Sequence, residues 1–544
     1  MHGIDAGRFF GSEFGFSTKL PFPLDLKRFA LYNYWVRSYP FCGEGRVFVM
    51  KKIGFDNAAY IRRQSEQISK RISEFGGKLY LEFGGKLFDD YHASRVLPGF
   101  APDSKLQMLK SIAKDVEVVI VINSADIESN KIRRDLGITY DTDVLRLIDA
   151  YRGAGLYVGS VVLGQFKGQP AAEAFKTKLE QLGVKVFIHY SIEGYPYNVS
   201  HIVSEAGFGK NEFIETTRPL VVITAPGPGS GKMSTCLSQL YHENLRGNKA
   251  GYAKFETFPI WNLPLKHPVN LAYEAATADL NDVNMIDPYH LEAYGETTVN
   301  YNRDVEVFPV LNAIFERIEG VSPYKSPTDM GVNMVGYCIC DDEVTKQASK
   351  EEIVRRYFNA MCDFRMGRGK QEAVDKIVSL MNQAGVTVED RPVIKAALDR
   401  SAETEGQPAV AIELPDGRIV TGKTSNLLGS SSAALLNAAK AIAGLPDDLL
   451  MIAPSIIEPI QELKTGILKG HNPRLHSDET LIALSMSANT NPVAKKALES
   501  IEMLKGCEAH STVILSQVDS DVYRKIGINL TCEPRYQTKK LYHK

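Results

Sequence analysis

The most informative stretch of the sequence reads Pro219-Leu-Val-Val-Ile-Thr224, followed by Ala225-Pro-Gly-Pro-Gly-Ser-Gly-Lys232. The apolar run predicts a buried strand, and the glycine-rich segment predicts a tight turn into a helix over 233–245. Phosphate binding needs backbone N–H groups that converge on an anion at a helix N-terminus, where the helix dipole also favours negative charge. The order of strand, glycine loop and helix is therefore typical of a phosphate-binding loop.

The predicted phosphate ligands are Gly227, Gly229, Ser230, Gly231, Lys232, Ser234 and Thr235. In such loops the lysine supplies a point charge for the terminal phosphates, and a hydroxyl can hold Mg²⁺. The segment departs from the standard pattern G-x-x-x-x-G-K-[ST], because Pro226 replaces the first glycine and Met233 follows the lysine. Anion binding tolerates these changes more easily than magnesium ligation does. The alternative interpretation is a tight turn with a solvated lysine.

Strands and helices alternate on the N-terminal side of this stretch. The predicted strands cover 78–83, 117–122, 157–163, 184–189 and 250–255, and the predicted helices begin at Ala58 or cover 141–151 and 170–182. Strands that alternate with helices indicate an α/β fold with a mostly parallel sheet covered on both faces. The expected architecture is Rossmann-like or P-loop-like.

A second glycine pair follows the first predicted strand, in Glu82-Phe-Gly-Gly-Lys86, and polar residues come soon after it. We predict that Gly84 and Gly85 bind phosphate and that Lys86, Asp89 and Lys232 are catalytic. An ordinary helix-entry loop is the alternative. If both glycine loops follow strands of one parallel sheet, they emerge at the same edge, where ligands of open α/β sheets bind at a switch in strand order. Two separate sheets would place them apart.

Other polar segments give weaker predictions. Arg133 and Arg134 follow the second buried strand and can pair with an anionic ligand, so Arg133 joins the predicted phosphate ligands; a solvated loop is the alternative. Gly429-Ser-Ser-Ser432 opens an alanine-rich helix, where close packing is favoured over a second anion site. The carboxylates that could orient water or a metal after the 250–255 strand are Glu256, Asp279, Asp282 and Asp287.

The pattern of predicted strands and helices changes along the chain and predicts three domains after an N-terminal leader. Residues 50–265 form the α/β domain, 266–405 a mainly helical domain, and 406–544 a smaller α+β domain with a hairpin across Pro415-Asp-Gly417 and strands at 511–515 and 528–532. Residues 1–49 show no sustained period, and regular sequence starts at Met50. We expect Met50 to be the functional start; a genuine N-terminal arm is the alternative.

Composition narrows the functional classes. The net charge of −2 gives no support for a nucleic-acid or membrane-surface binder, and no apolar run is long enough to span a bilayer. Seven cysteines without a secretory signal favour reduced thiols in the cytoplasm. Cys338 and Cys340 lack further ligands at suitable spacing, so no structural metal is expected.

Several motifs resemble a bacterial family known as domain of unknown function 1846. They are Met50-Lys-Lys-Ile-Gly-Phe-Asp56, Leu79-Tyr-Leu-Glu-Phe-Gly-Gly-Lys-Leu-Phe-Asp-Asp-Tyr-His92, Arg95-Val-Leu-Pro-Gly-Phe100, Gly137-Ile-Thr-Tyr-Asp141, the glycine loop itself and Cys236-Leu-Ser-Gln-Leu-Tyr-His-Glu243. The resemblance runs from Met50 to roughly the C-terminus. It implies a multi-domain cytoplasmic protein and brings no catalytic residues with it. A weaker likeness in layout, including Gly251-Tyr-Ala-Lys254, is to P-loop ligases of the dethiobiotin-synthetase type.

The sequence therefore predicts a nucleotide- or phosphometabolite-binding enzyme of the phosphoryl-transfer or ATP-dependent ligase type. ATP and Mg²⁺ are the expected cofactors, and the expected partner is a phosphorylated small molecule or nucleotide, with homo-oligomer formation open. One alternative is a binding or sensor protein that holds a phosphorylated ligand without turning it over. Another is an enzyme that acts on a phosphorylated sugar or nucleotide without ATP.

Overall fold

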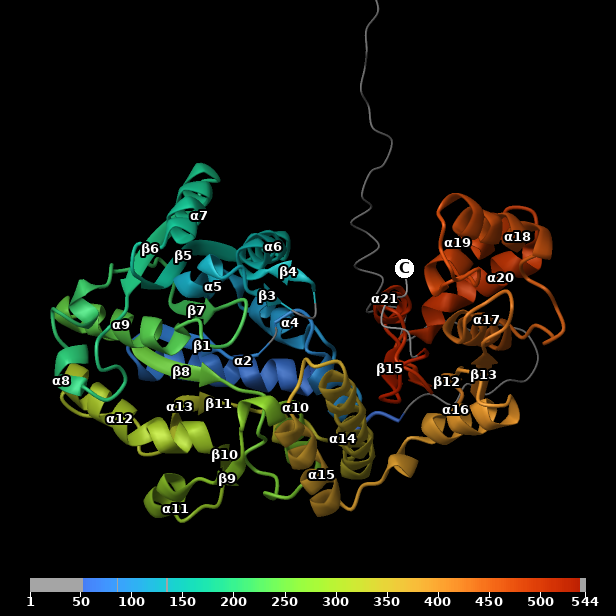
Figure 1. Ribbon diagram of the computed structural model, residues 1–544. Helices are drawn as coiled ribbons and strands as arrows, with labels where there is room; N and C mark the ends of the chain where they lie inside the picture. The colour runs from blue at the N-terminus through green and yellow to red at the C-terminus, as the bar shows by residue number, and fades with distance from the viewer. Residues whose placement is uncertain (1–51, 86, 134–135, 539–544) are drawn as a thin grey trace, which may run out of the picture. The chain divides into compact units, whose positions relative to one another are not determined.

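The computed structural model describes residues 52–85, 87–133 and 136–538 of the chain (Figure 1). The predicted start at Met50, the predicted catalytic Lys86 and the predicted anion ligand Arg134 lie outside these residues.

A seven-stranded parallel sheet forms the centre of the N-terminal part, with the order β11-β8-β1-β7-β2-β5-β6. Its strands are β1 (Leu79–Phe83), β2 (Val116–Asn123), β5 (Tyr157–Phe166), β6 (Lys185–Tyr190), β7 (Leu220–Thr224), β8 (Gly251–Phe255) and β11 (Gly331–Val332). Every residue of β1, β7 and β8 is buried, as expected for strands covered on both faces. The predicted α/β fold is confirmed.

Helices cover both faces of this sheet, because successive strand residues point to opposite sides. Leu79 and Leu81 of β1 belong to one apolar core, while Tyr80 belongs to the other. The first core contains residues of α2 (Asn57–Glu74), α3 (Tyr91–Val96), α4 (Ser104–Ser111), α6 (Tyr140–Gly153), α7 (Pro170–Gln181), α10 (Pro268–Ala276), α14 (Asp342–Arg365) and α15 (Gln371–Ala384). The second contains residues of α8 (Val199–Ile202), α9 (Lys232–Leu245), α12 (Asn302–Glu319) and α13 (Pro327–Met330).

The chain does not lay the strands down in spatial order. It passes from β1 to β2, β5 and β6, then returns to place β7 in the position between β1 and β2, and finally crosses β1 to reach β8. Right-handed crossovers that run in opposite directions put their helices on opposite faces. The connection after β1 therefore leaves toward the first core and the connection after β7 toward the second. In open α/β sheets, a reversal of this kind at the carboxyl ends of two adjacent strands is the usual ligand position.

The mainly helical segment is tied into the same sheet through β11. It also carries the small hairpin of β9 (Asn284–Ile286) and β10 (Val299–Tyr301), together with α11 (Pro288–Tyr294) and α16 (Pro392–Glu403). Helix α14 begins at Asp342. The Asp341 side chain accepts a hydrogen bond from the N–H of Val344 and thereby caps the first turn.

The smaller C-terminal domain has a mixed sheet of order β13-β12-β14-β15, in which only β14 and β15 run parallel. Its strands are β12 (Ala409–Glu413), β13 (Ile419–Lys423), β14 (Glu508–Ser511) and β15 (Asn529–Cys532), and its helices include α17 (Ser430–Ile442), α18 (Pro454–Glu462), α19 (Ser477–Ala488), α20 (Pro492–Ser500) and α21 (Gln517–Ile526).

The strand predicted at 511–515 is wrong, since β14 ends at Ser511. The Ser511 hydroxyl donates to the carbonyl of Val513 and accepts from its N–H, which turns the chain out of the sheet.

No helix among the described residues is long and apolar enough to cross a bilayer. The six cysteines of the described ranges are free thiols.

Candidate functional site

The glycine loop joins the end of β7 to the start of α9. Gly229 and Gly231 have φ angles of 74° and 94°, in the left-handed region that favours glycine, and Gly231 is the N-cap residue of α9. Within the described part of the chain, no group accepts a hydrogen bond from the N–H of Gly227, Gly229, Ser230 or Gly231. These amides are the donors that an anion at a helix N-terminus would use.

The loop is held in shape by its own neighbours. Ser230 is buried, and its hydroxyl donates to the carbonyl of Gly227 at 2.5 Å, so its side chain is already engaged inside the loop. A methyl group on Gly227 would lie 2.4 Å from the hydroxyl of Tyr140 at the start of α6. A methyl group on Gly164 of β5 would lie 3.2 Å from the carbonyl of Ser230. The loop therefore packs closely over the ends of neighbouring strands.

The side chains that follow the loop differ in accessibility. Lys232 is the first residue of α9 and is partly exposed, as is Ser234, whereas Thr235 is only 2% exposed. Tyr195, which comes from the connection after β6, lies beside the Ser234 side chain. Of the two predicted hydroxyl ligands, Ser234 is therefore the one that an incoming ligand can reach.

The second glycine pair follows β1, which belongs to the same parallel sheet as β7 and is its neighbour. Because β1 and β7 are adjacent and parallel, Gly84 and Gly85 leave the sheet from the same edge as the glycine loop. A methyl group on Gly85 would lie 3.1 Å from the ammonium of Lys105, which is 2% exposed.

Lys105 forms an ion pair of 2.6 Å with Asp90. Burial alone would raise the pKa of Asp90, but the Lys105 ammonium outweighs it and lowers that pKa. Sequence reasoning missed Lys105, which belongs to α4 and is part of no motif. Asp89 is partly buried, and its carbonyl accepts from the N–H of Tyr91.

Arg133 forms an ion pair with α6, the helix whose first residue, Tyr140, contacts the glycine loop. Its guanidinium donates to the carboxylate of Asp143 at 2.8 Å, and Arg146 donates to the same carboxylate. Asp143 is fully buried, so the two arginines compensate a charge inside α6. The polar segment after β2 thus contributes mainly to local structure.

A row of buried polar side chains runs along the second-core face of the sheet at the same edge. Glu82 of β1 and Lys254 of β8 are register partners, and the hydroxyl of Tyr252 donates to Glu82 at 2.8 Å. The Lys254 ammonium donates to the carboxylate of Asp304 and to the hydroxyl of Tyr301, both from the start of the α12 region. A buried lysine among carboxylates is held in its charged form.

Glu256 ends this row and is the least satisfied member. It is 6% exposed, and its Oε1 lies 3.1 Å from the Lys254 ammonium, yet neither oxygen accepts a hydrogen bond of good geometry from a described residue. Burial raises the pKa of Glu256 to about 7, although the Lys254 charge opposes the rise. A carboxyl group that titrates near neutral pH can both accept and donate a proton.

The other predicted carboxylates have structural roles or are exposed. Asp282 pairs with Arg303, with 2.6 Å between Oδ1 and Nε. Asp287 caps α11 and accepts from the hydroxyl of Thr328. Asp279 is exposed.

One end of the buried polar row and the glycine loop both lie close to Cys236 in α9. The pKa of Cys236 is raised by burial and, to a smaller extent, by the Glu82 carboxylate. The charge of Lys232, which lies one helical turn earlier, opposes this rise. Tyr195, which is 36% exposed, also lies within range of the Glu82 charge. Glu82 and Lys232 therefore act on the same part of α9, although they come from distant segments of the chain.

The glycine-serine run at the start of α17 is a packing feature. Ser430, Ser431 and Ser432 are buried, and Ser432 donates to the carbonyl of Leu475 at 3.0 Å. A methyl group on Gly422 of β13 would lie 2.1 Å from the backbone nitrogen of Ala434. Close approach of strand and helix explains the small residues here.

Within the described ranges, no three His, Cys, Asp or Glu side chains are placed to hold a metal ion together. A Mg²⁺ ion at the glycine loop would have to rely on Ser234, ligand phosphates and water, a ligand set that Mg²⁺ commonly accepts.

Comparison with other proteins places the chain in a family. Residues 53–385 match the family described as "Domain of unknown function DUF1846, N-terminal", and residues 389–542 match "Domain of unknown function DUF1846, C-terminal". The UPF0371 protein of Streptococcus thermophilus (strain ATCC BAA-491 / LMD-9) is 58% identical over 495 residues, which are 91% of this chain and all of the relative. The UPF0371 protein of Streptococcus pyogenes serotype M5 (strain Manfredo) is 57% identical over the same shares. The chain therefore belongs to the bacterial DUF1846 family, a family of unknown function, and the resemblance noted in its sequence motifs is confirmed.

Proposed function

We propose that the protein is a nucleotide- or phosphometabolite-binding enzyme of the phosphoryl-transfer or ATP-dependent ligase type. One observation carries the proposal. The N–H groups of Gly227, Gly229, Ser230 and Gly231 have no acceptor among the described residues, and they lie at the N-terminus of a 14-residue helix. They also lie where the strand connections reverse, which is the usual ligand position in open α/β sheets.

The proposed roles follow from the chemistry of each group. The loop amides and the Lys232 ammonium neutralise charge on the phosphates, including the charge that develops during transfer. Glu256 exchanges a proton with the reacting group, since its pKa is raised to about 7. When Mg²⁺ is bound with the ligand phosphates, it supplies further charge neutralisation, and Ser234 is the residue that would hold it.

A binding or sensor protein is the second candidate. It is favoured by Met233, which occupies the position where phosphate-binding loops carry a magnesium-binding hydroxyl. A protein of this kind would hold the phosphorylated ligand and release it unchanged. A third candidate, an enzyme for a phosphorylated sugar or nucleotide, would use the loop for substrate phosphate without ATP.

The direct test is calorimetric titration of ATP, with and without Mg²⁺, into the wild type and Lys232→Ala. Loss of a charge-assisted hydrogen bond costs about 1.5–3 kcal/mol, so we expect the affinity to fall about tenfold or more. Lys395→Ala is the control, because this lysine is 75% exposed on α16. Equal affinities of wild type and Lys232→Ala would remove Lys232 from the site. Release of phosphate or ADP by the wild type separates the enzyme from the sensor, and titration of sugar phosphates addresses the third candidate.

A further inference from the structure

A large cleft lies between helices of the N-terminal part and the C-terminal domain. Its volume is about 1330 Å³, and α3, α14, α21 and β15 contribute to its walls. The cationic residues that line it are Arg95, Arg355, Arg368, Arg474, Arg524, His471 and His476. None of the described residues that line the cleft is an aspartate or glutamate. A concave surface with one sign of charge concentrates ions of the opposite sign.

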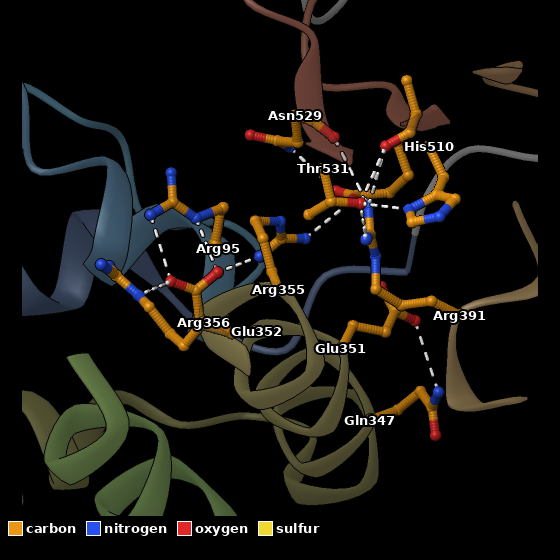
Figure 2. A network of polar contacts seen from close by, with 12 residues as sticks. Arg95, Gln347, Glu351, Glu352, Arg355, Arg356, Arg391, His510, Asn529 and Thr531 are labelled. Carbon is orange, nitrogen blue, oxygen red and sulfur yellow. Dashed lines mark hydrogen bonds and ion pairs between the residues drawn. The ribbon is translucent and has the colours of Figure 1, made fainter. Parts of the chain in front are cut away.

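The inner wall of the cleft is a buried network of guanidinium groups (Figure 2). Glu352 is fully buried and accepts from the Nε atoms of Arg95 and Arg356, each at 2.8 Å, and from Arg355. In Figure 2 the three arginines surround this one carboxylate. Arg355 also reaches across to the C-terminal sheet, where its Nη2 donates to Glu508 at 2.6 Å.

The network carries more positive than negative charge. Arg391 donates to Glu508 at 2.9 Å as the fourth guanidinium, and Glu351 acts on Arg355 and Arg391 as the third carboxylate. Four cations thus face three anions in this network, and the side chains of Arg95 and Arg356 are 22% and 27% exposed. An excess of positive charge favours the approach of a further anion.

One buried donor of this network has no acceptor among the described residues. Arg355 lines the cleft and is 5% exposed, and its Nε has no hydrogen-bond partner among the described residues. Buried donors are rarely left without an acceptor, because the desolvation cost is then uncompensated. The Arg355 guanidinium therefore brings positive charge to the cleft wall that its described partners do not fully use.

The rim of the cleft carries further arginines that have few ion-pair or hydrogen-bond partners among the described residues. Arg368 is exposed, Arg524 pairs with Asp521 at 3.1 Å on the surface, and Arg474 uses its Nε on the carbonyl of Ser425. The hydrogen bond to Asp519 raises the pKa of His476, which keeps this ring cationic over a wider pH range. Apolar walls are also present, from Met366, Ile514, Leu515, Ile528 and the ring of Tyr536.

We propose that this cleft is a second binding site, for a small organic molecule that carries two or more phosphate groups. The arginine forks match phosphate oxygens in pairs, and the apolar side chains contact the organic part. The cleft shares no residue with the glycine loop, so this site does not depend on the function proposed for that loop.

The test is a calorimetric titration of inorganic tripolyphosphate at low ionic strength. The double variant R368Q/R524Q removes two exposed rim charges and leaves the buried network intact. We expect its affinity to be about tenfold or more below that of the wild type. R400Q is the matched control, since Arg400 is an exposed arginine of α16 outside the cleft, and its affinity should be unchanged. Thermal unfolding checks that all variants are folded.

Two further measurements make the result specific. In the Lys232→Ala background, R368Q/R524Q must still lower tripolyphosphate affinity, which separates this cleft from the glycine loop. Citrate should bind more weakly than tripolyphosphate if phosphate is the preferred anion. The proposal is overturned if the wild type does not bind tripolyphosphate, if R368Q/R524Q matches R400Q, if Lys232→Ala alone abolishes all binding, or if citrate binds as tightly.

Discussion

The carboxyl group of Glu256 is buried between Lys254 and the edge of β11. Gly331 of β11 is so close that a methyl group there would lie 3.1 Å from Glu256 Oε2. Because burial raises the pKa of Glu256 to about 7, the folded protein holds a proton on this group that the unfolded chain releases near its ordinary pKa. Between those two pKa values the folded state binds more protons than the unfolded state. The stability contributed by this proton is therefore lost as the pH rises.

Glu256→Gln should remove this pH dependence, since glutamine mimics the protonated carboxyl group. We expect the free energy of unfolding of the wild type to fall by about 1–3 kcal/mol more than that of Glu256→Gln between pH 5 and pH 8. Urea unfolding at several pH values measures the difference. Parallel pH profiles for the two proteins would show that Glu256 titrates normally in the folded state.

Some residues of the candidate site could be predicted from local sequence patterns, and others could not. The glycines and Lys232 were predictable, because a strand, a glycine run and a helix start are local patterns. Glu256 was one of four possible carboxylates, and only the fold shows that it is buried without a hydrogen-bond donor for either oxygen among the described residues. Lys105 and Tyr195 could not be predicted, because each reaches the site from a distant segment of the chain.

Helix α14 connects the two parts of the molecule through Arg355. Its carboxylate partner in β14, Glu508, also accepts from Arg391, which is 1% exposed. Removing one partner of a buried ion pair is far more costly than removing an exposed pair, because the remaining charge stays in a poorly solvated place.

Glu508→Gln should therefore destabilise the protein by about 3–5 kcal/mol. Glu403→Gln is the control, since Glu403 pairs with Arg400 on the surface of α16 and its side chain is 63% exposed. An exposed pair contributes about 0–1 kcal/mol. Denaturant unfolding of both variants tests the comparison, and equal losses would mean that the Arg355–Glu508 contact is not buried in solution.

The elements themselves were largely predictable, and their pairing was not. The strands of the central sheet are continuous apolar runs, so β7 and β8 begin within one residue of the predicted strands. The position of β7 between β1 and β2 has no local signature, because it depends on crossovers between distant segments. Polar strands were also harder to place: β14 reads Glu-Ala-His-Ser and is buried only through contacts with β12 and β15.

The whole chain is nearly neutral, yet its charges are unevenly distributed. A net charge of −2 argues against a general polyanion binder, and the cleft proposed above collects arginines from α3, α14 and the C-terminal domain. These residues come from separate segments between Arg95 and Arg524, so no window of the sequence shows a basic run. A near-neutral net charge therefore argues against a protein that binds polyanions over its whole surface, but it does not exclude a single cationic site.

The insertion of β7 between β1 and β2 also constrains how the protein is made. Strands β2, β5 and β6 are neighbours that can pair as soon as they leave the ribosome, but both neighbours of β1 are synthesised later. Until Leu220–Thr224 emerges, β1 has no partner and β2 keeps an unpaired edge, which is the kind of surface that attracts other chains. Pulsed hydrogen exchange during refolding should show the amides of β1 gaining protection together with those of β7, after β5 and β6. Protection of β1 before β7 would rule out this order. The first strand of the sheet to be translated is thus among the last to gain its partners, which leaves the nascent chain with an exposed strand that chaperones can protect.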